Sequence, residues 1–199
     1  MQHARPDVFP CLALVIAVLL QVHANAAVLG GEVVVAGVRF GLVAGPGGRW
    51  HETQVEVAVR PAPDNATRFV SRVKVAIELG YEAPDRDGAR LEFYRAEATA
   101  VAVERGRALF RFYLPPEIVE RDRISGDLRY YHITPSAAGV EMPPDRRQSG
   151  PGLADPAALA NFRSQVAARA GENDGVLLPH HRAPLAMRDS APPGPTLLP

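Results

Sequence analysis

The stretch Phe69-Val70-Ser71-Arg72-Val73-Lys74-Val75-Ala76-Ile77-Glu78-Leu79 carries the clearest structural signal in the chain. Its alternate residues form one mainly apolar face, made of Phe69, Ser71, Val73, Val75, Ile77 and Leu79. Arg72, Lys74 and Glu78 lie on the other face. An alternation with a period of two is typical of a strand that buries one face and leaves the other in water. This stretch therefore predicts a half-buried β-strand.

Further strands flank this one on both sides. Residues Trp50–Arg60 alternate in the same way, with Val55, Val57 and Val59 on the apolar face. Strands are also expected at residues 32–43, 91–104, 108–114 and 127–134, and a Pro/Gly-rich loop at residues 135–152. Many short strands joined by turns predict a mainly β protein, an antiparallel immunoglobulin-like β-sandwich.

One helix is expected near residues 156–170, close to the C-terminus. Asp155 is a suitable N-cap, Pro156 suits the first helical position, and Gly171 suits the stop. Leu159, Phe162 and Val166 form an apolar stripe opposite Arg163 and Arg169. We expect this stripe to pack on the sandwich or on a neighbouring subunit.

The N-terminus has the three parts of a secretory signal peptide. Arg5 precedes the apolar run Cys11–Leu20, and small residues follow at Ala24-Asn25-Ala26. The run is shorter than the ~20 residues of a membrane-spanning helix, so no stable membrane span is expected after cleavage. The predicted organisation is a signal peptide at 1–26, a β-sandwich domain at 27–181 and a disordered tail at 182–199. Export places the protein in the periplasm, at the cell surface or outside the cell.

Composition narrows the function classes. The 22 basic and 22 acidic residues balance, which gives no electrostatic reason to expect a nucleic-acid partner. The single cysteine, Cys11, lies in the signal peptide, which removes thiol nucleophiles and Cys-ligated metals from the mature protein. The chain has neither an H-E-x-x-H nor a G-x-S-x-G motif, and the turn Asp85–Gly88 lacks the remaining ligands of a calcium loop. No catalytic, cofactor-binding or metal residue is predicted, and the protein is not expected to be an enzyme.

Several segments resemble a family of secreted pilus-like proteins. The similarity lies in residues Phe69–Val75, Leu91–Ala98, Phe112–Asp122, Phe162–Arg163 and Asn173–Pro179. Members of this family accompany type IV pilus assembly genes in verrucomicrobial-type bacteria. The resemblance implies an immunoglobulin-like or pilus-like β-sandwich with a helical addition and a non-enzymatic role in the cell envelope. The apolar run here ends in A-x-A instead of following a processing glycine, so the chain is not itself a processed type IV pilin.

The leading functional hypothesis is a structural or accessory component of a pilus or envelope assembly, acting through protein contacts and possible self-association. Sheet edges and the stripe Leu159, Phe162 and Val166 are the candidate surfaces, because unpaired strand edges can pair with other chains. The charged segment Glu117–Arg123 is either a partner-binding loop or a solvated turn. The alternative hypothesis is a secreted carbohydrate-binding module that uses aromatic residues on the strands, such as Trp50 and Tyr131. A third hypothesis is a periplasmic hydrolase.

Overall fold

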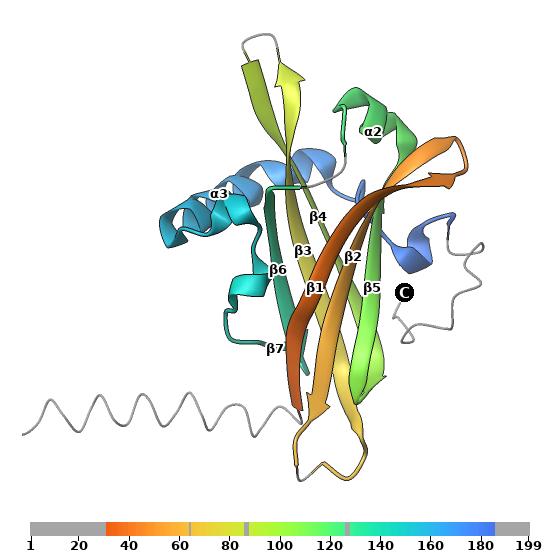
Figure 1. Ribbon diagram of the computed structural model, residues 1–199, viewed down its shortest axis with the longest axis vertical. Coiled ribbons are helices and arrows are strands. Elements are labelled where there is room, and N and C mark those ends of the chain that lie inside the picture. Colours follow the sequence, from red (N-terminus) through yellow and green to blue (C-terminus); the bar gives the residue numbers. More distant parts are fainter. Residues whose placement is uncertain (1–30, 64, 86–87, 126–127, 186–199) are drawn as a thin grey trace, which may run out of the picture.

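The computed structural model describes residues 31–185 except residues 64, 86–87 and 126–127. The predicted signal peptide at 1–26 lies outside the described residues. Two antiparallel sheets pack face to face, with one long helix on the outside of the second sheet (Figure 1). The strands are β1 (Gly31–Gly45), β2 (Gly48–Pro61), β3 (Phe69–Asp85), β4 (Gly88–Glu104), β5 (Gly106–Leu114), β6 (Tyr130–Ala137), β7 (Val140–Glu141) and β8 (Leu178–Pro179). The helices are α2 (Pro116–Arg121) and α3 (Pro156–Arg169), with short 3-10 turns η1 (Arg146–Gln148), η2 (Pro151–Leu153), η3 (Ala170–Asn173) and η4 (His180–Arg182).

The strand order agrees with an immunoglobulin-like sandwich. The first sheet has the order β1-β2-β5-β8 and the second has the order β4-β3-β6-β7. Constant-type immunoglobulin domains place their strands as ABED and CFG. The arrangement here differs in two strands: β4 pairs with β3 in the second sheet instead of joining the first, and the short β8 pairs with β5 in the first sheet. The prediction of an antiparallel immunoglobulin-like β-sandwich with a C-terminal helix is confirmed.

The core lies between the sheets and follows from the period-two pattern. Val55, Val57 and Val59 of β2 face inward and are at most 1% exposed. The second sheet contributes inward-facing β3 residues that are 0% exposed, Val73, Val75, Ile77 and Leu79. Burying one such side chain contributes about 1.5–3 kcal/mol. Strands β2 and β3, each in the middle of its sheet, therefore contribute much of the apolar burial that stabilises the sandwich.

The prediction of which β3 residues face the core is wrong at the start of the strand. Phe69 is 44% exposed, whereas Val70 is buried in the same core as Val73. The phase changes at Arg72, whose φ of 49° lies in the left-handed region. Such a residue turns the backbone out of the regular pleat, so Phe69 and Ser71 face outward while Val73, Val75, Ile77 and Leu79 keep the predicted inward face.

Strand β6 extends into the start of the segment 135–152 that was expected to be a loop. It runs from Tyr130 to Ala137, whereas the sequence predicted a strand at 127–134 and a loop from Pro135. Pro135 pairs opposite Val75 on β3, and its carbonyl accepts a hydrogen bond from the Met142 N–H at 2.8 Å. A proline cannot donate within a sheet, but here the strand continues because its carbonyl and its neighbours still pair.

Helix α3 packs on the outer face of the second sheet. The Asp155 carboxylate accepts a hydrogen bond from the Ala158 N–H at 3.0 Å, as expected of an N-cap. Phe162 and Val166 are buried against Phe93 of β4, so this stripe is covered within the chain and is not an exposed docking surface. Arg163 and Arg169 do not point away from the sheet as predicted. Arg169 donates to the Leu91 carbonyl at 3.0 Å, and Arg163 lies 3.9 Å from the Glu78 carboxylate.

The end of α3 and the C-terminal segment also differ from expectation. The helix passes directly into η3, and the glycine with a left-handed φ is Gly175, at 77°, not Gly171. After β8, Leu185 packs with Trp50 of β2, beyond the predicted domain end at His181. Residues 182–185, which were assigned to the tail, therefore belong to the packed domain. Residues 186–199 lie outside the described residues.

Candidate functional site

A buried polar cluster lies at the end of the sandwich, beside α2. The Tyr94 hydroxyl, on β4, donates to the Asp122 carboxylate directly after α2. Arg121 clamps the same pair, with its Nε 2.7 Å from Asp122 Oδ1 and its Nη2 2.8 Å from the Tyr94 oxygen. Tyr94 is 0% exposed and Asp122 is 4% exposed. The segment predicted as a partner loop or solvated turn thus sends its last carboxylate into the protein interior.

The electrostatics of this cluster favour a fixed charge state. Burial raises the pKa of the Tyr94 hydroxyl, and its hydrogen bond to Asp122 raises the pKa further. Burial opposes ionisation of Asp122, but the hydrogen bonds from Arg121 and Tyr94 prevail and lower the pKa of that carboxyl. Tyr94 is consequently a neutral donor and Asp122 an ionised acceptor at neutral pH, an arrangement suited to holding α2 against the sheet.

A second buried polar pair continues the cluster into the core. The Tyr81 hydroxyl lies 3.2 Å from Nδ1 of His51, and the Tyr81 and Tyr94 rings are 5.9 Å apart. Burial is the largest cause that raises the pKa of Tyr81. The four side chains Tyr81, His51, Tyr94 and Asp122 thus connect β2, β3, β4 and the end of α2.

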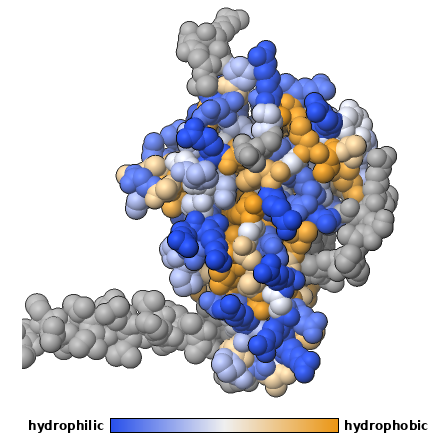
Figure 2. All heavy atoms as spheres, in the orientation of Figure 1, coloured by the Kyte–Doolittle hydropathy of each residue, from blue (hydrophilic) through white to orange (hydrophobic). Residues whose placement is uncertain are grey.

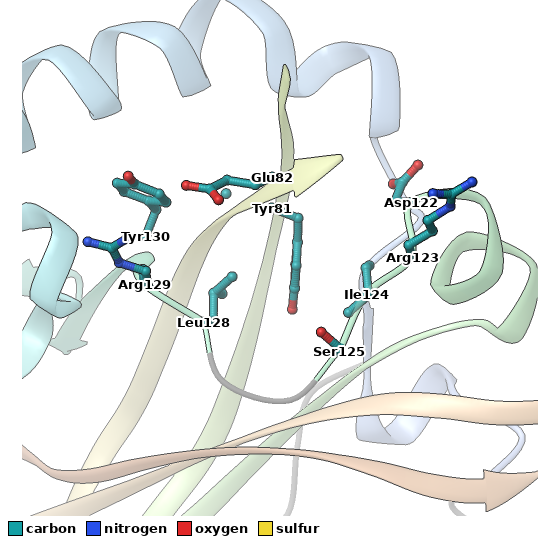
Figure 3. Close-up of a pocket in the computed structure, with 10 residues that line it drawn as sticks. Tyr81, Glu82, Asp122, Arg123, Ile124, Ser125, Leu128, Arg129 and Tyr130 are labelled. Atoms are coloured by element: carbon teal, nitrogen blue, oxygen red, sulfur yellow. The ribbon is translucent and has the colours of Figure 1, made fainter. Parts of the chain in front are cut away.

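Two cavities adjoin this end of the sandwich, and Asp122 lines both. The first has a volume of about 170 Å³ and lies between β3 and the segment that follows α2. Figure 3 shows Tyr81 and Leu128 near its centre, with Asp122 and Arg123 on one side and Arg129 and Tyr130 on the other. The second, about 420 Å³, is more polar and is lined by Ala83, Pro84, Arg90, Glu92, Arg121, Asp122, Glu172 and Asn173. An ion pair between Arg90 and Glu92 crosses its wall.

A third cavity, of about 220 Å³, lies on the outer face of the second sheet next to α3. We call it the outer-face cavity; it is lined by Lys74, Ala76, Glu78, Thr134, Ser136, Gly139, Glu141 and Arg163. Burial raises the pKa of Glu78, and Arg163 partly offsets this effect. Sequence reasoning missed this site because it placed Pro135–Gly152 in a loop. No local signal marks the site, which depends on the pairing of β6 with β3.

Most of the aromatic candidates are inaccessible to a ligand. Tyr81 and Tyr94 lie in the core, and Trp50 and Tyr113 are 6% and 2% exposed. Tyr131 is half-buried, with its ring 5.2 Å from that of Phe40. Within the described part of the chain, the structure brings together no exposed platform of Trp50 and Tyr131, because Trp50 is covered by the C-terminal segment.

The histidines that the structure describes, His51, His132, His180 and His181, are dispersed over the molecule. His51 is in the core, His132 lies 3.0 Å from the Ser149 hydroxyl, and His180 and His181 are in η4. Among the described residues, no group of three or more His, Cys, Asp and Glu side chains has an arrangement that could hold a metal ion. The turn Asp85–Gly88 includes residues 86–87, which are outside the described residues. In the described part of the chain, no helix has the length and apolar character to cross a bilayer.

Comparison with known proteins gives a structural relative. No family model matches the chain, and no curated protein matches its sequence. A crystal structure of a protein from Akkermansia muciniphila matches with a TM-score of 0.63 and 13% sequence identity, over 85% of this chain and 94% of that chain. A likeness at this identity establishes the fold alone.

Proposed function

We propose that this protein is exported and serves as a non-catalytic structural or accessory component of a pilus or cell-envelope assembly. The signal-like N-terminus and the resemblance to secreted pilus-like proteins support export and an envelope role. The sandwich fold, shared with the Akkermansia muciniphila protein, is compatible with this role. The single observation that supports contact with a partner is that the edge strand β1 leaves several apolar side chains partly exposed.

Among the described residues, strand β1 pairs only with β2 and lies at one edge of its sheet. Val33 and Val35, before a bulge between Val35 and Gly37, are 0% exposed. After the bulge, Val38 and Phe40 pair opposite core residues of β2 but are only partly buried, and Leu42 is 36% exposed. Figure 1 shows the tip of the β1–β2 hairpin bending away from the second sheet. A strand added along this part of β1 would cover these side chains and satisfy its free backbone groups.

The opposite edge of the molecule is protected. Strand β4 lies at one edge of the second sheet, with the short β7 at the other, and carries the charged residues Arg90, Glu92, Arg95, Glu97 and Glu104. Only Glu32 and Arg39 are charged among the 15 residues of β1. Charged side chains along an edge discourage pairing with other chains. The contrast makes β1 the preferred edge for strand addition.

Site-specific photocrosslinking in the native host tests this role. A photoreactive amino acid replaces Leu42 on β1 in one variant and Val101 on β4, 45% exposed, in the matched control. We expect adducts from position 42, identified by mass spectrometry as an envelope-assembly protein or a second copy of this chain. Adducts that form equally from position 101, or uncrosslinked monomer from both, would contradict the proposal. Recovery of a mature N-terminus at Ala27 from the envelope fraction tests export separately.

A further inference from the structure

The outer-face cavity is built by three rows of cross-strand neighbours. Lys74, Ser136 and Glu141 form one row, and Ala76 and Thr134 form the next. Glu78 and His132 form the third row, where Arg163 of α3 approaches Glu78. Lys74 and Glu78 are four positions apart on β3, a separation of about 13 Å along a strand. Charged groups therefore lie at both ends of the cavity, with the smaller Ala76 and Thr134 between them.

In the part of the protein that the structure describes, Ser136 lacks the hydrogen bond that a buried hydroxyl normally makes. The residue lines the cavity and is 3% exposed, and its buried hydroxyl oxygen has no hydrogen-bond partner among the described residues. Glu78 Oε2 is also without a hydrogen bond there, although Arg163 Nε lies 3.9 Å away. Burying a hydroxyl without a hydrogen-bond partner destabilises the folded state. A group that enters the cavity and offers a hydrogen bond would recover this free energy.

The charges around the cavity define the chemistry of that group. Lys74 and Arg163 carry two positive charges and Glu78 and Glu141 carry two negative charges, so the side chains that line the cavity have no formal net charge. Lys74 is already bonded to Glu97 at 3.1 Å. What the walls offer is a mixture of donors and acceptors, with the hydroxyls of Thr134 and Ser136 able to act as both. A ligand hydroxyl is likewise both a donor and an acceptor, which suits it to such a mixed wall.

We propose that the outer-face cavity binds a neutral polyhydroxylated ligand, a sugar unit, with Ser136, Thr134 and Glu78 as its hydrogen-bonding partners. This site is separate from the β1 edge and from the aromatic residues considered for carbohydrate binding. Its cavity of about 220 Å³ is several times the roughly 30 Å³ that one water occupies in the liquid. Arg163 of α3 and Glu141 of β7 both line this cavity, so a sugar in it would contact the helix as well as the sheet.

Titration of the isotope-labelled mature chain tests the proposal by NMR. The probes are glucose, galactose, mannose and N-acetylglucosamine, with methylammonium chloride and sodium acetate as charged comparisons. We expect saturable shifts of the Thr134, Ser136 and Gly139 amides with at least one sugar. No saturable shift with any sugar, or saturable shifts with the charged probes only, would overturn the proposal.

Variants distinguish this site from adventitious sugar contact. Thr134→Val and Ser136→Ala should each weaken sugar binding about tenfold, the effect of one lost hydrogen bond of about 1.4 kcal/mol. Thr99→Val makes the same change one strand away, opposite Lys74 on β4, and should leave affinity unchanged. Ser136→Ala should fold at least as stably as the parent, because it removes a buried hydroxyl without a partner. Unchanged affinity in both cavity variants, or equal loss in the Thr99→Val control, would overturn the proposal.

Discussion

Tyr94 and Asp122, which are 28 residues apart in the sequence, meet in a buried hydrogen bond at the end of the sandwich. Replacing Tyr94 with Phe leaves the Asp122 carboxylate, whose residue is only 4% exposed, with one hydrogen-bond donor fewer. We expect Tyr94→Phe to lower the free energy of unfolding by about 1–3 kcal/mol, measured by urea denaturation at neutral pH. Tyr131→Phe is the control and should change stability by less than about 0.5 kcal/mol. Equal effects of the two changes would contradict this role of the hydroxyl.

His132 should make stability depend on pH in the mildly acidic range. Burial, together with nearby Arg163, lowers the pKa of His132 below its ordinary value of 6.5. Below that value the unfolded chain binds a proton that the folded chain does not, so stability falls as the pH decreases toward the folded-state pKa. We expect His132→Gln to flatten the plot of unfolding free energy against pH between about pH 7 and 5. Parallel plots for parent and variant would show that His132 does not carry this dependence.

Gly80 allows α3 to approach the second sheet. A Cβ at this position would lie 2.9 Å from Cε2 of Phe162 and 3.3 Å from Cβ of Tyr130. Gly80→Ala should therefore displace the Phe162 ring and destabilise the protein by about 1–3 kcal/mol. Gly41→Ala on β1 is the matched control, because a Cβ there meets no atom within 4 Å. Thermal unfolding of the two variants compares them, and equal midpoints would contradict the proposed close contact.

Arg72 occupies a backbone conformation that favours glycine. Its φ of 49° costs an ordinary residue about 1–2 kcal/mol, whereas glycine in a regular strand costs about 0.5–1 kcal/mol. Arg72→Gly should therefore be neutral or stabilising. Ala102→Gly, opposite the adjacent Ser71 on β4, should be destabilising by about 0.5–1 kcal/mol. Urea denaturation checks both values, and a loss at Arg72 as large as that at Ala102 would show that the left-handed backbone there is not a strain.

The sequence predicts those parts of the fold that local patterns determine. The alternation from Val73 to Leu79 needs only neighbouring residues to be recognised, as does the Asp155–Pro156 start of α3. The change of phase at Arg72 left no such signal, because arginine adopts a left-handed backbone there only in the context of the paired strands. The extension of β6 past Pro135 was missed for a similar reason, since the carbonyl of Pro135 finds its partner Met142 beyond a turn.

The candidate sites depend even more on distant pairings. Asp122 belongs to a charged segment that is typical of a solvated turn, and only the approach of Tyr94 from β4 gives its carboxylate a buried partner. Ser136 and Thr134 gain meaning only when β6 lies beside β3 and α3 closes over the sheet. Neither arrangement follows from spacing along the chain, because each joins segments through long-range packing.

The contact of Leu185 with the Trp50 indole, made possible by Gly45, fixes the last described residues to the first hairpin. A Cβ at Gly45 would lie 2.6 Å from Trp50 Cδ1 and 2.7 Å from Leu185 Cδ2, so no larger residue fits between them. Recombinant versions truncated before Ala183 would expose Trp50 and Tyr113 to solvent and would be prone to aggregate. A purification tag added beyond Leu185 would leave this contact intact.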